Sequence, residues 1–311
     1  MVKRTVGLVM VALALSSIWS CMAPAHRSTG RPAVVYISDF GQRDGAVSSM
    51  KGVARGVEPE LVLEDLSHRI KPFDIWEAAY RLRQTAGYWP SGTVFVCVID
   101  PGVGSARRSV VARTESGQLF VTPDNGTLTL IAESDPIVEL REISAAHRVP
   151  GSERSATFHG RDVYSLTGAL LASGQLSFEQ VGDALDPASL VRLDHPRHVV
   201  EITEEHGEVH RGMLPVLDSN FGNVWTNLST LRISEALEGS QLRVMIEHDG
   251  QQVFEGVLPF VSSFGQVPLG ESLAYSNSLG ELAFALNQGS FAERFGISAG
   301  PGWTVSVRVG Q

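Results

Sequence analysis

Short apolar runs alternate with helix-like stretches over the first part of the chain. The runs AVVYISDF, LVLEDL and TVFVCVID begin at Ala33, Leu61 and Thr93, and apolar residues at helical spacing fill 46–57 and 75–88 between them. Strands that are apolar along their whole length and alternate with helices are typical of a mostly parallel sheet covered on both faces. We therefore predict an α/β domain in which a mostly parallel sheet is sandwiched by helices.

The pattern changes near residue 198. After a polar, proline-containing stretch, the helix signals largely stop and short alternating strands with glycine turns follow, among them VVEITEEHG, QLRVMIEHDG, QQVFEGVLPF and WTVSVRVG. Such strands are typical of a small barrel or sandwich. The sequence thus predicts an α/β domain over 32–198 and a smaller C-terminal all-β, barrel- or sandwich-like domain over 199–311.

The N-terminal segment is expected to lie outside both domains. Lys3 and Arg4 precede an apolar run that is too short to span a bilayer permanently, and small polar residues follow it. This layout is typical of an export signal. We expect residues 1–21 to be the signal segment, 22–31 to be a tether, and the mature protein to be exported.

Cys21 suggests that the exported protein is attached to a membrane through a lipid. The preceding residues Ile18, Trp19 and Ser20 resemble the lipobox of bacterial lipoproteins, although Trp19 departs from that pattern. The resemblance implies lipidation of Cys21 and a periplasmic or cell-envelope location, with membrane attachment only through the N-terminal lipid. A plain cleaved signal that ends near residues 23–25 is the alternative.

Composition excludes several classes of protein. The 311 residues are 43% hydrophobic and 19% charged, which is typical of a globular chain rather than a disordered or fibrous one. The net charge of −9, without any long basic run, argues against a nucleic-acid partner. Two cysteines cannot build a disulfide framework.

Small polar residues follow three of the predicted strands. Asp39, Asp100 and Asp124 lie in SDFGQRD, DPGVG and PDNG, and Arg107 comes shortly after the second of these. Each segment alone is typical of a turn. Because open α/β sheets bind ligands beyond the carboxyl ends of their strands, the three together predict a carboxylate-lined cleft.

The sequence offers little support for other kinds of site. Phosphate-binding loops and the GxSxG motif are absent. The pairs His195/His198 and His206/His210 have metal-ligand spacing but no third ligand, so we expect no metal. His159 in TFHGRD precedes a helix among groups that can orient it, with a core or capping histidine as the alternative.

Several motifs together resemble one enzyme family. SDFGxxD, DPGVGxxRR, PDNG, TFHGRD and DSNFGN occur in order, followed by NSLG and ALNQG. The chain is similar in these motifs to the S-adenosylmethionine (SAM) hydrolases that form adenosine, also called SAM hydroxide adenosyltransferases, which are relatives of the fluorinases and chlorinases. The resemblance covers nearly all of the chain after the signal segment.

The resemblance implies that water attacks C5′ of the SAM ribose and that methionine leaves as a neutral thioether. By motif position, the family's catalytic Asp-Arg-His set falls on Asp100, Arg107 and His159. Such groups can orient a water molecule, stabilise the forming hydroxide and accept its proton. Which of the three takes the proton is left open by the sequence. No cofactor is expected, since SAM is the substrate.

The resemblance also implies the residues that bind this substrate. Asp39 would accept hydrogen bonds from the ribose hydroxyls, and Phe73 would pack against the nucleoside. The remaining expected ligands are those of the methionine ammonium (Asp44 and Asp218), of its carboxylate (Ser278) and of the adenine (Phe221, Asn223 and Phe264).

Family members are homotrimers with each site between two subunits, and the resemblance implies the same assembly here. Two other functions stay open. A SAM-dependent halogenase would carry a serine in place of Gly160 and would lack a carboxylate like that of Asp100, which repels halide. A nucleoside-binding lipoprotein without turnover would not need the Asp-Arg-His set.

Overall fold

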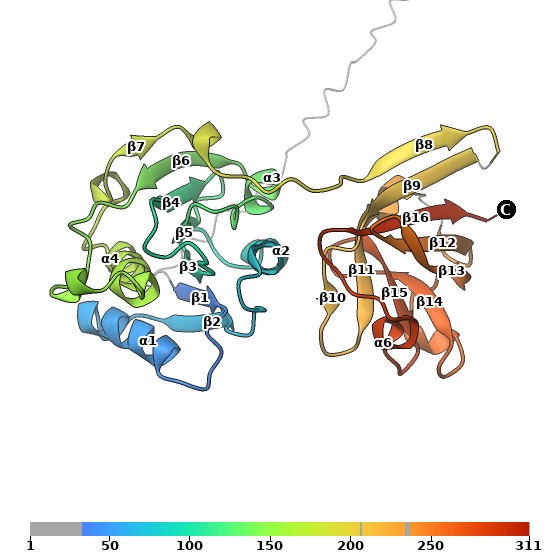
Figure 1. Ribbon diagram of the computed structural model, residues 1–311, viewed down its shortest axis with the longest axis horizontal. Helices are drawn as coiled ribbons and strands as arrows, with labels where there is room; N and C mark the ends of the chain where they lie inside the picture. The colour runs from blue at the N-terminus through green and yellow to red at the C-terminus, as the bar shows by residue number, and fades with distance from the viewer. Residues whose placement is uncertain (1–32, 206, 234–236, 311) are drawn as a thin grey trace, which may run out of the picture.

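The structure, a computed structural model, describes residues 33–205, 207–233 and 237–310. The chain forms an α/β domain and a β domain, joined by an extended linker (Figure 1). The predicted signal segment, the tether and Cys21 lie outside the described residues. Within the described ranges, no helix is long and apolar enough to cross a membrane.

A seven-stranded sheet in the order β2-β1-β3-β5-β4-β6-β7 forms the centre of the α/β domain. β2, β1, β3 and β5 are parallel neighbours, while β4 runs antiparallel to β5 and β6. β6 therefore points the same way as the parallel strands, and the prediction of a mostly parallel sheet is confirmed. The strands are β1 (Val34–Ser38), β2 (Leu63–Ser67), β3 (Val94–Val98), β4 (Ser109–Thr114), β5 (Leu119–Pro123), β6 (Ile137–Glu142) and β7 (Ala184–Leu185).

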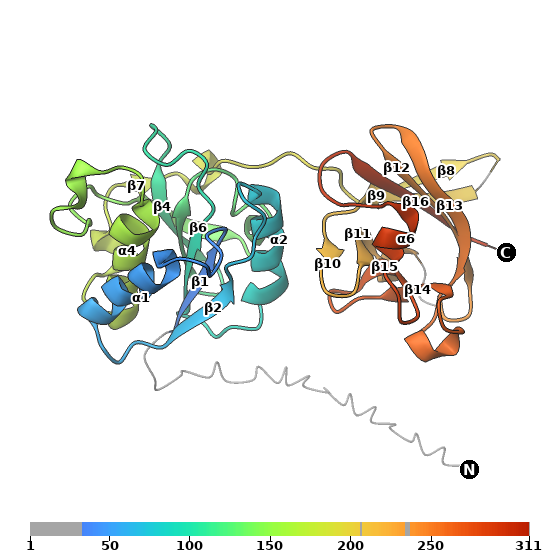
Figure 2. The ribbon, with the colours of Figure 1, turned by 60° about the horizontal axis from the view of Figure 1, so that its bottom comes forward.

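Helices cover both faces of this sheet (Figure 2). Val34 and Tyr36 pack with α1 and α4 on one face, and Val35 and Ile37 pack with α2 on the other. Every residue of β1 and β3 is buried, which explains why these strands appear as continuous apolar runs. Burial also raises the pKa of Cys97 on β3, as befits a core thiol. The helices are α1 (Ala46–Val57), α2 (Ile75–Ala86), α3 (Ile131–Ser134) and α4 (Leu166–Ser173).

Two antiparallel sheets share one core in the β domain. Their orders are β13-β12-β16-β9-β8 and β10-β11-β15-β14. Val244 and Ile246 of the first sheet meet Phe284 of the second in this core, so the all-β domain is a sandwich. Its elements are β8 (Val199–Thr203), β9 (Gly207–Met213), β10 (Leu217–Asp218), β11 (Asn223–Ser229), α5 (Thr230–Ile233), β12 (Gln241–His248), β13 (Gln251–Pro259), β14 (Ser272–Ser276), β15 (Glu281–Leu286), α6 (Phe291–Phe295) and β16 (Trp303–Val309).

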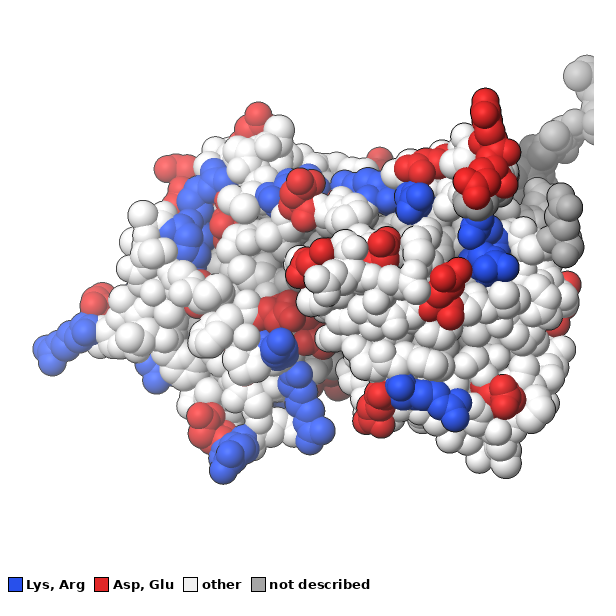
Figure 3. Space-filling view, turned by 45° about the vertical axis from the view of Figure 1, so that its right-hand side comes forward, with Lys and Arg blue, Asp and Glu red and all other residues white. Residues whose placement is uncertain are grey.

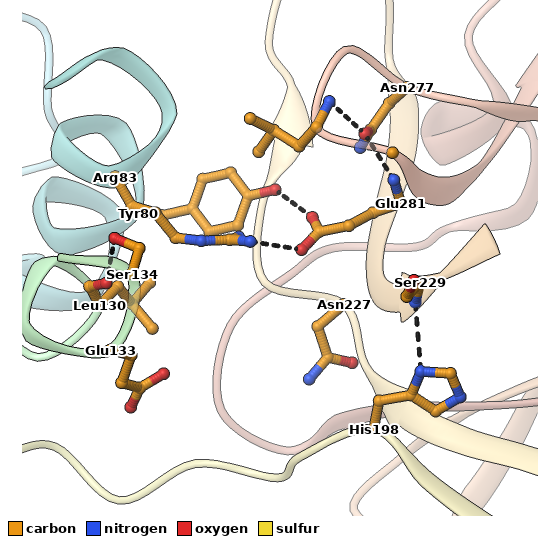
Figure 4. Close-up of polar contacts among 12 residues, drawn as sticks. Tyr80, Arg83, Leu130, Glu133, Ser134, His198, Asn227, Ser229, Asn277 and Glu281 are labelled. Carbon is orange, nitrogen blue, oxygen red and sulfur yellow. Dashed lines mark hydrogen bonds and ion pairs between the residues drawn. The ribbon is translucent and has the colours of Figure 1, made fainter. Parts of the chain in front are cut away.

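Helix α2 of the α/β domain contacts the β domain. Figure 4 shows the Tyr80 hydroxyl and the Arg83 guanidinium donating to the Glu281 carboxylate of β15, at 3.1 and 2.9 Å. The Trp76 indole donates to the Pro215 carbonyl at 2.9 Å. The Glu281 side chain is only 8% exposed, so its two donors compensate a desolvated charge. These contacts fix α2 against the sandwich.

The surface mixes charges of both signs. On the face drawn in Figure 3, most basic side chains lie beside acidic ones. With a net charge of −9, this face gives no electrostatic reason to expect a polyanionic partner.

Candidate active site

Three loops follow the neighbouring parallel strands β1, β3 and β5 and carry Asp39, Asp100 and Asp124. The structure brings Asp39 and Asp100 to one cavity of about 290 Å³, here called the Asp100 cavity. Asp124 turns elsewhere: its carboxylate is 1% exposed, pairs with Arg108 and accepts the Val191 N–H at 2.9 Å. The prediction that all three carboxylates line one cleft is therefore wrong for Asp124. This side chain instead binds the backbone of Val191, in the extended linker that leads to β8 at Val199.

The Asp100 cavity combines aromatic walls with a polar end. Phe40 and Phe158 pack edge to face with their ring centroids 5.6 Å apart. Polar groups come from Asp39, Asp100 and His159, which line the same space. A pocket with apolar walls and a few convergent polar groups is suited to bind a small molecule.

Asp39 and Phe73 form one side of this cavity. The Phe73 N–H donates to Asp39 Oδ2 at 2.9 Å. Phe73 has a φ of +67° and its side chain is 69% exposed, although a bulky residue rarely adopts this left-handed conformation. The strained turn presents an aromatic ring at the cavity beside a carboxylate.

Asp100 and Arg107 form a two-pronged ion pair. Arg107 Nε donates to Asp100 Oδ1 at 2.7 Å, and Nη2 donates to Oδ2. Their side chains are 6% and 11% exposed, so the pair is largely removed from water. The remaining N–H groups of Arg107 reach Ser109 Oγ at 2.8 Å and His159 Nδ1 at 2.9 Å. Arg107 thus holds the other two members of the set in fixed positions.

The contact with Arg107 fixes the proton on His159. A guanidinium only donates, so Nδ1 of His159 must accept and the ring proton must lie on Nε2. Burial, reinforced by the charges of Arg107 and Arg148, lowers the pKa of His159. His159 is therefore a neutral imidazole at neutral pH, and its Nε2–H has no hydrogen-bond partner among the residues that the structure describes.

The backbone after His159 is tightly packed. Gly160 begins a π-helical turn (Gly160–Ser165) that leads into α4. A Cβ on Gly160 would lie 2.9 Å from Val98 Cγ1 and 3.2 Å from Phe40 Cε2, so a side chain there requires movement of the wall. Glycine at this position lets the turn that carries His159 lie close to β3.

The β domain has a larger cavity of about 1030 Å³, here called the Asp218 cavity. It is lined by four of the predicted ligands: Asp218, Phe221, Asn223 and Phe264. Asn223 is buried and its amide reaches Asp218 at 3.3 Å, while Phe221 is 66% exposed. Four predicted site residues thus line the Asp100 cavity and four line the Asp218 cavity, in different domains.

Two further predicted ligands lie outside both cavity linings. Asp44 is exposed and accepts the Ala46 N–H at 2.9 Å at the start of α1. Ser278 is exposed in the turn before β15. The neighbouring Asn277 accepts the Glu281 N–H at 3.1 Å (Figure 4), which orders this turn.

The histidine pairs are engaged in other contacts. His198 accepts the Ser229 N–H and contacts His210 Nδ1 at 3.0 Å. His195 contacts Glu133 at 3.1 Å, and His206 lies outside the described residues. Among the residues that the structure describes, no group of three or more His, Cys, Asp or Glu side chains could hold a metal ion.

Two residues beside the catalytic set were not singled out by the sequence. The Tyr164 hydroxyl lies 3.1 Å from Ser109 Oγ and 3.5 Å from Asp100 Oδ2, and the Arg107 guanidinium lies 5.7 Å from the ring centroid. Tyr164 lies two residues after the HGRD segment, but only the folded chain shows that it meets Ser109 of β4.

These features define a class: two-domain proteins with an Asp-Arg-His site beyond the carboxyl ends of parallel strands and a second cavity in a β-sandwich. Family models described as the SAM hydroxide adenosyltransferase N-terminal and C-terminal domains match residues 34–182 and 212–304. The chain belongs to the SAM hydroxide adenosyltransferase family.

Named relatives fall into two groups. A protein named (R)-S-adenosyl-L-methionine hydrolase from Thermus thermophilus is 35% identical over 273 residues, covering 86% of this chain and 96% of that protein. A protein named fluorinase from an Actinoplanes species is 29% identical over 302 residues, covering 90% and 99%. A crystal structure of an uncharacterized conserved protein from Thermotoga maritima superposes with a TM-score of 0.79 at 31% identity, covering 88% and 99%.

Proposed function

We propose that the protein hydrolyses SAM to adenosine and L-methionine by in-line attack of water on ribose C5′. The observation that carries this proposal is the Asp100-Arg107-His159 network at the polar end of a cavity that also contains Asp39. The relatives named SAM hydrolase support it, since they cover most of the chain. The reaction class is therefore nucleophilic substitution by water at a sulfonium carbon.

The geometry assigns a different role to each member of the set. Arg107 cannot accept a proton, and the only free nitrogen of His159 already carries one. Asp100 is therefore the proton acceptor, and His159 Nε2–H donates a hydrogen bond that orients the water. Arg107 holds both groups and stabilises the negative charge that develops on the attacking oxygen.

The proposed hydrolysis requires neither a metal nor a cofactor. The leaving group is a neutral thioether, so no Lewis acid is needed to stabilise it. The demanding part is the alignment of a weak nucleophile with the C5′–S bond, and fixed hydrogen bonds supply that alignment. We accordingly propose metal-independent hydrolysis.

Two features favour water over halide as the nucleophile. The Asp100 carboxylate lines the cavity, and its charge would repel an incoming halide. Gly160 leaves no space for the serine side chain of the halogenases unless Val98 or Phe40 moves. We therefore place the chain with the hydrolases rather than with the fluorinases.

We further propose that the active enzyme is a homotrimer with sites between subunits. A volume of about 290 Å³ is just below the ~300–1,000 Å³ of ligand pockets, so the Asp100 cavity suits only part of SAM. The Asp218 cavity offers the complementary groups for adenine and the methionine ammonium. Assembly of two chains would join one cavity of each kind.

The N-terminal segment has the layout of an export signal followed by a cysteine. Residues 1–21 are proposed to direct export, and Cys21 to carry a lipid that holds the enzyme in the cell envelope.

The test is chromatography of SAM after incubation with the purified protein, with and without excess EDTA. Adenosine and methionine in equal amounts in both arms are expected. Asp100→Asn should abolish product, whereas Asp135→Asn should not, since Asp135 bonds Ser116 at the opposite end of β4. Intact SAM, activity only after metal addition, or a halogenated nucleoside in chloride or fluoride would contradict the proposal.

A further inference from the structure

A third cavity borders the catalytic set at His159. It has a volume of about 480 Å³ and is here called the Glu142 cavity. His159 lines both this cavity and the Asp100 cavity, and Ser109 lines the Glu142 cavity only. Most of its walls are polar, and Asp183 among them is exposed to solvent. Its polar lining includes Glu142, Ser144, His147, Arg148 and Asp183.

The proposed reaction makes such a space useful. SAM carries a sulfonium charge and its products do not, so each turnover releases one proton: SAM⁺ and water give adenosine, methionine and H⁺. With substrate filling the Asp100 cavity, that proton needs another way out. Asp100 must also lose it before the next cycle begins.

A chain of hydroxyls connects Asp100 to the Glu142 cavity. Asp100 Oδ2 lies 3.5 Å from the Tyr164 hydroxyl, which lies 3.1 Å from Ser109 Oγ. Ser109 in turn lines the Glu142 cavity and accepts an N–H of Arg107 at 2.8 Å. His159 cannot serve instead, because its Nδ1 is occupied by Arg107.

We propose that Tyr164 and Ser109 relay the proton from Asp100 to the Glu142 cavity. The inference rests on the proposed hydrolysis. The protonated carboxyl donates to the Tyr164 oxygen, Tyr164 passes its own proton to Ser109, and Ser109 passes its proton to water in the cavity. Each hydroxyl gains one proton and loses one, so neither is ionised. Burial raises the pKa of Tyr164, which agrees with a hydroxyl that stays neutral.

The relay is tested by removing single hydroxyls. Tyr164→Phe keeps the ring that packs against His159 and Arg107, and Ser109→Ala shortens the chain at its outer end. Tyr36→Phe is the matched control, because Tyr36 also bonds a serine, Ser165, at 2.9 Å in the same domain. Melting temperatures of all variants show whether each one folds.

Steady-state turnover of SAM is measured with increasing imidazole at constant pH and ionic strength. We expect kcat to fall by about 100-fold in Tyr164→Phe, the lower end of the effect of one acid–base group, and to recover as imidazole accepts the proton. Ser109→Ala should behave alike, while the wild type and Tyr36→Phe should not respond. If the wild type is active and kcat is unchanged in Tyr164→Phe and Ser109→Ala, the relay is overturned but the proposed function is not. The same holds if kcat falls and imidazole does not restore it. A wild type that releases no adenosine would overturn the proposed function and the relay with it.

Discussion

The Asp100–Arg107 ion pair has a structural role and a chemical role, and we expect substitutions to separate the two. Arg107→Met removes the guanidinium but keeps much of its volume, leaving a carboxylate that is only 6% exposed without its partner. Breaking a buried ion pair in this way costs about 3–5 kcal/mol. At about 2–4 °C per kcal/mol for a domain of about 150–250 residues, the range that includes the α/β domain, the melting temperature should fall by about 6–20 °C.

Removing both charges should reverse most of that loss. The double variant Asp100→Asn/Arg107→Met leaves no buried charge unpaired, so its melting temperature should recover towards that of the wild type. Turnover should not recover, because the proton acceptor and the positioning cation are both gone. We expect kcat to stay at least about 100-fold below the wild type both in Arg107→Met and in the double variant.

The adjacent ion pair provides the control. Arg108 pairs with Asp124, whose side chain is 1% exposed, but neither lines the Asp100 cavity. Arg108→Met and Asp124→Asn/Arg108→Met should repeat the loss and recovery of the melting temperature while turnover is retained. Thermal unfolding followed by fluorescence, with SAM turnover measured below the transition, gives both readouts. Substantial activity in Asp100→Asn/Arg107→Met would refute the catalytic assignment, and unchanged melting of Arg107→Met would refute the buried-charge argument.

Four further predictions concern other groups. The lowered pKa of His159 predicts a kcat/KM that is constant above about pH 7 and falls only below the ordinary value of 6.5, as a pH–rate profile will show. Burial lowers the pKa of His198 from 6.5 to about 4. Between pH 4 and pH 6.5, His198 therefore binds a proton in the unfolded chain but not in the folded chain. Stability is then complete above pH 6.5 and is lost as the pH falls towards 4, and His198→Asn should flatten the melting curve against pH. Glu281→Gln deprives Arg83 of its carboxylate and should cost about 1.5–3 kcal/mol in urea unfolding. Mass spectrometry of the mature N-terminus should show a lipid on Cys21, whereas a soluble chain that begins near residue 24 would indicate a plain signal.

Local patterns predicted most of the α/β domain. The helix expected over 46–57 occurs as Ala46–Val57, and Met50 and Ala54 of its apolar face are buried. The second helix ends at Ala86 rather than at 88, where Gly87 begins the turn that leads to β3. β11 and β15 were not predicted, since short buried runs such as ELAFAL do not distinguish a strand from a buried helix.

The site was harder to predict than the fold for a physical reason. Asp100 and Arg107 are seven residues apart, and one motif contains both. The contact between Arg107 and His159 spans 52 residues, and that between Ser109 and Tyr164 spans 55, so only the packing of α4 and its π-helical turn against the sheet creates them. Asp124 was predicted to line the site because it lies at the correct edge of the sheet. Its carboxylate instead accepts the Val191 N–H, which is a structural contact that the sequence does not show.

Hydrolysis in water enriched in ¹⁸O tests the central claim most directly. If water held by Asp100 and His159 attacks C5′, the adenosine formed from unlabelled SAM must carry one ¹⁸O at its 5′ hydroxyl, and the methionine must carry none. Mass spectrometry of both products from the wild type, with Asp100→Asn as the inactive control, distinguishes the possibilities. Adenosine without the label, or label in methionine instead, would contradict the account.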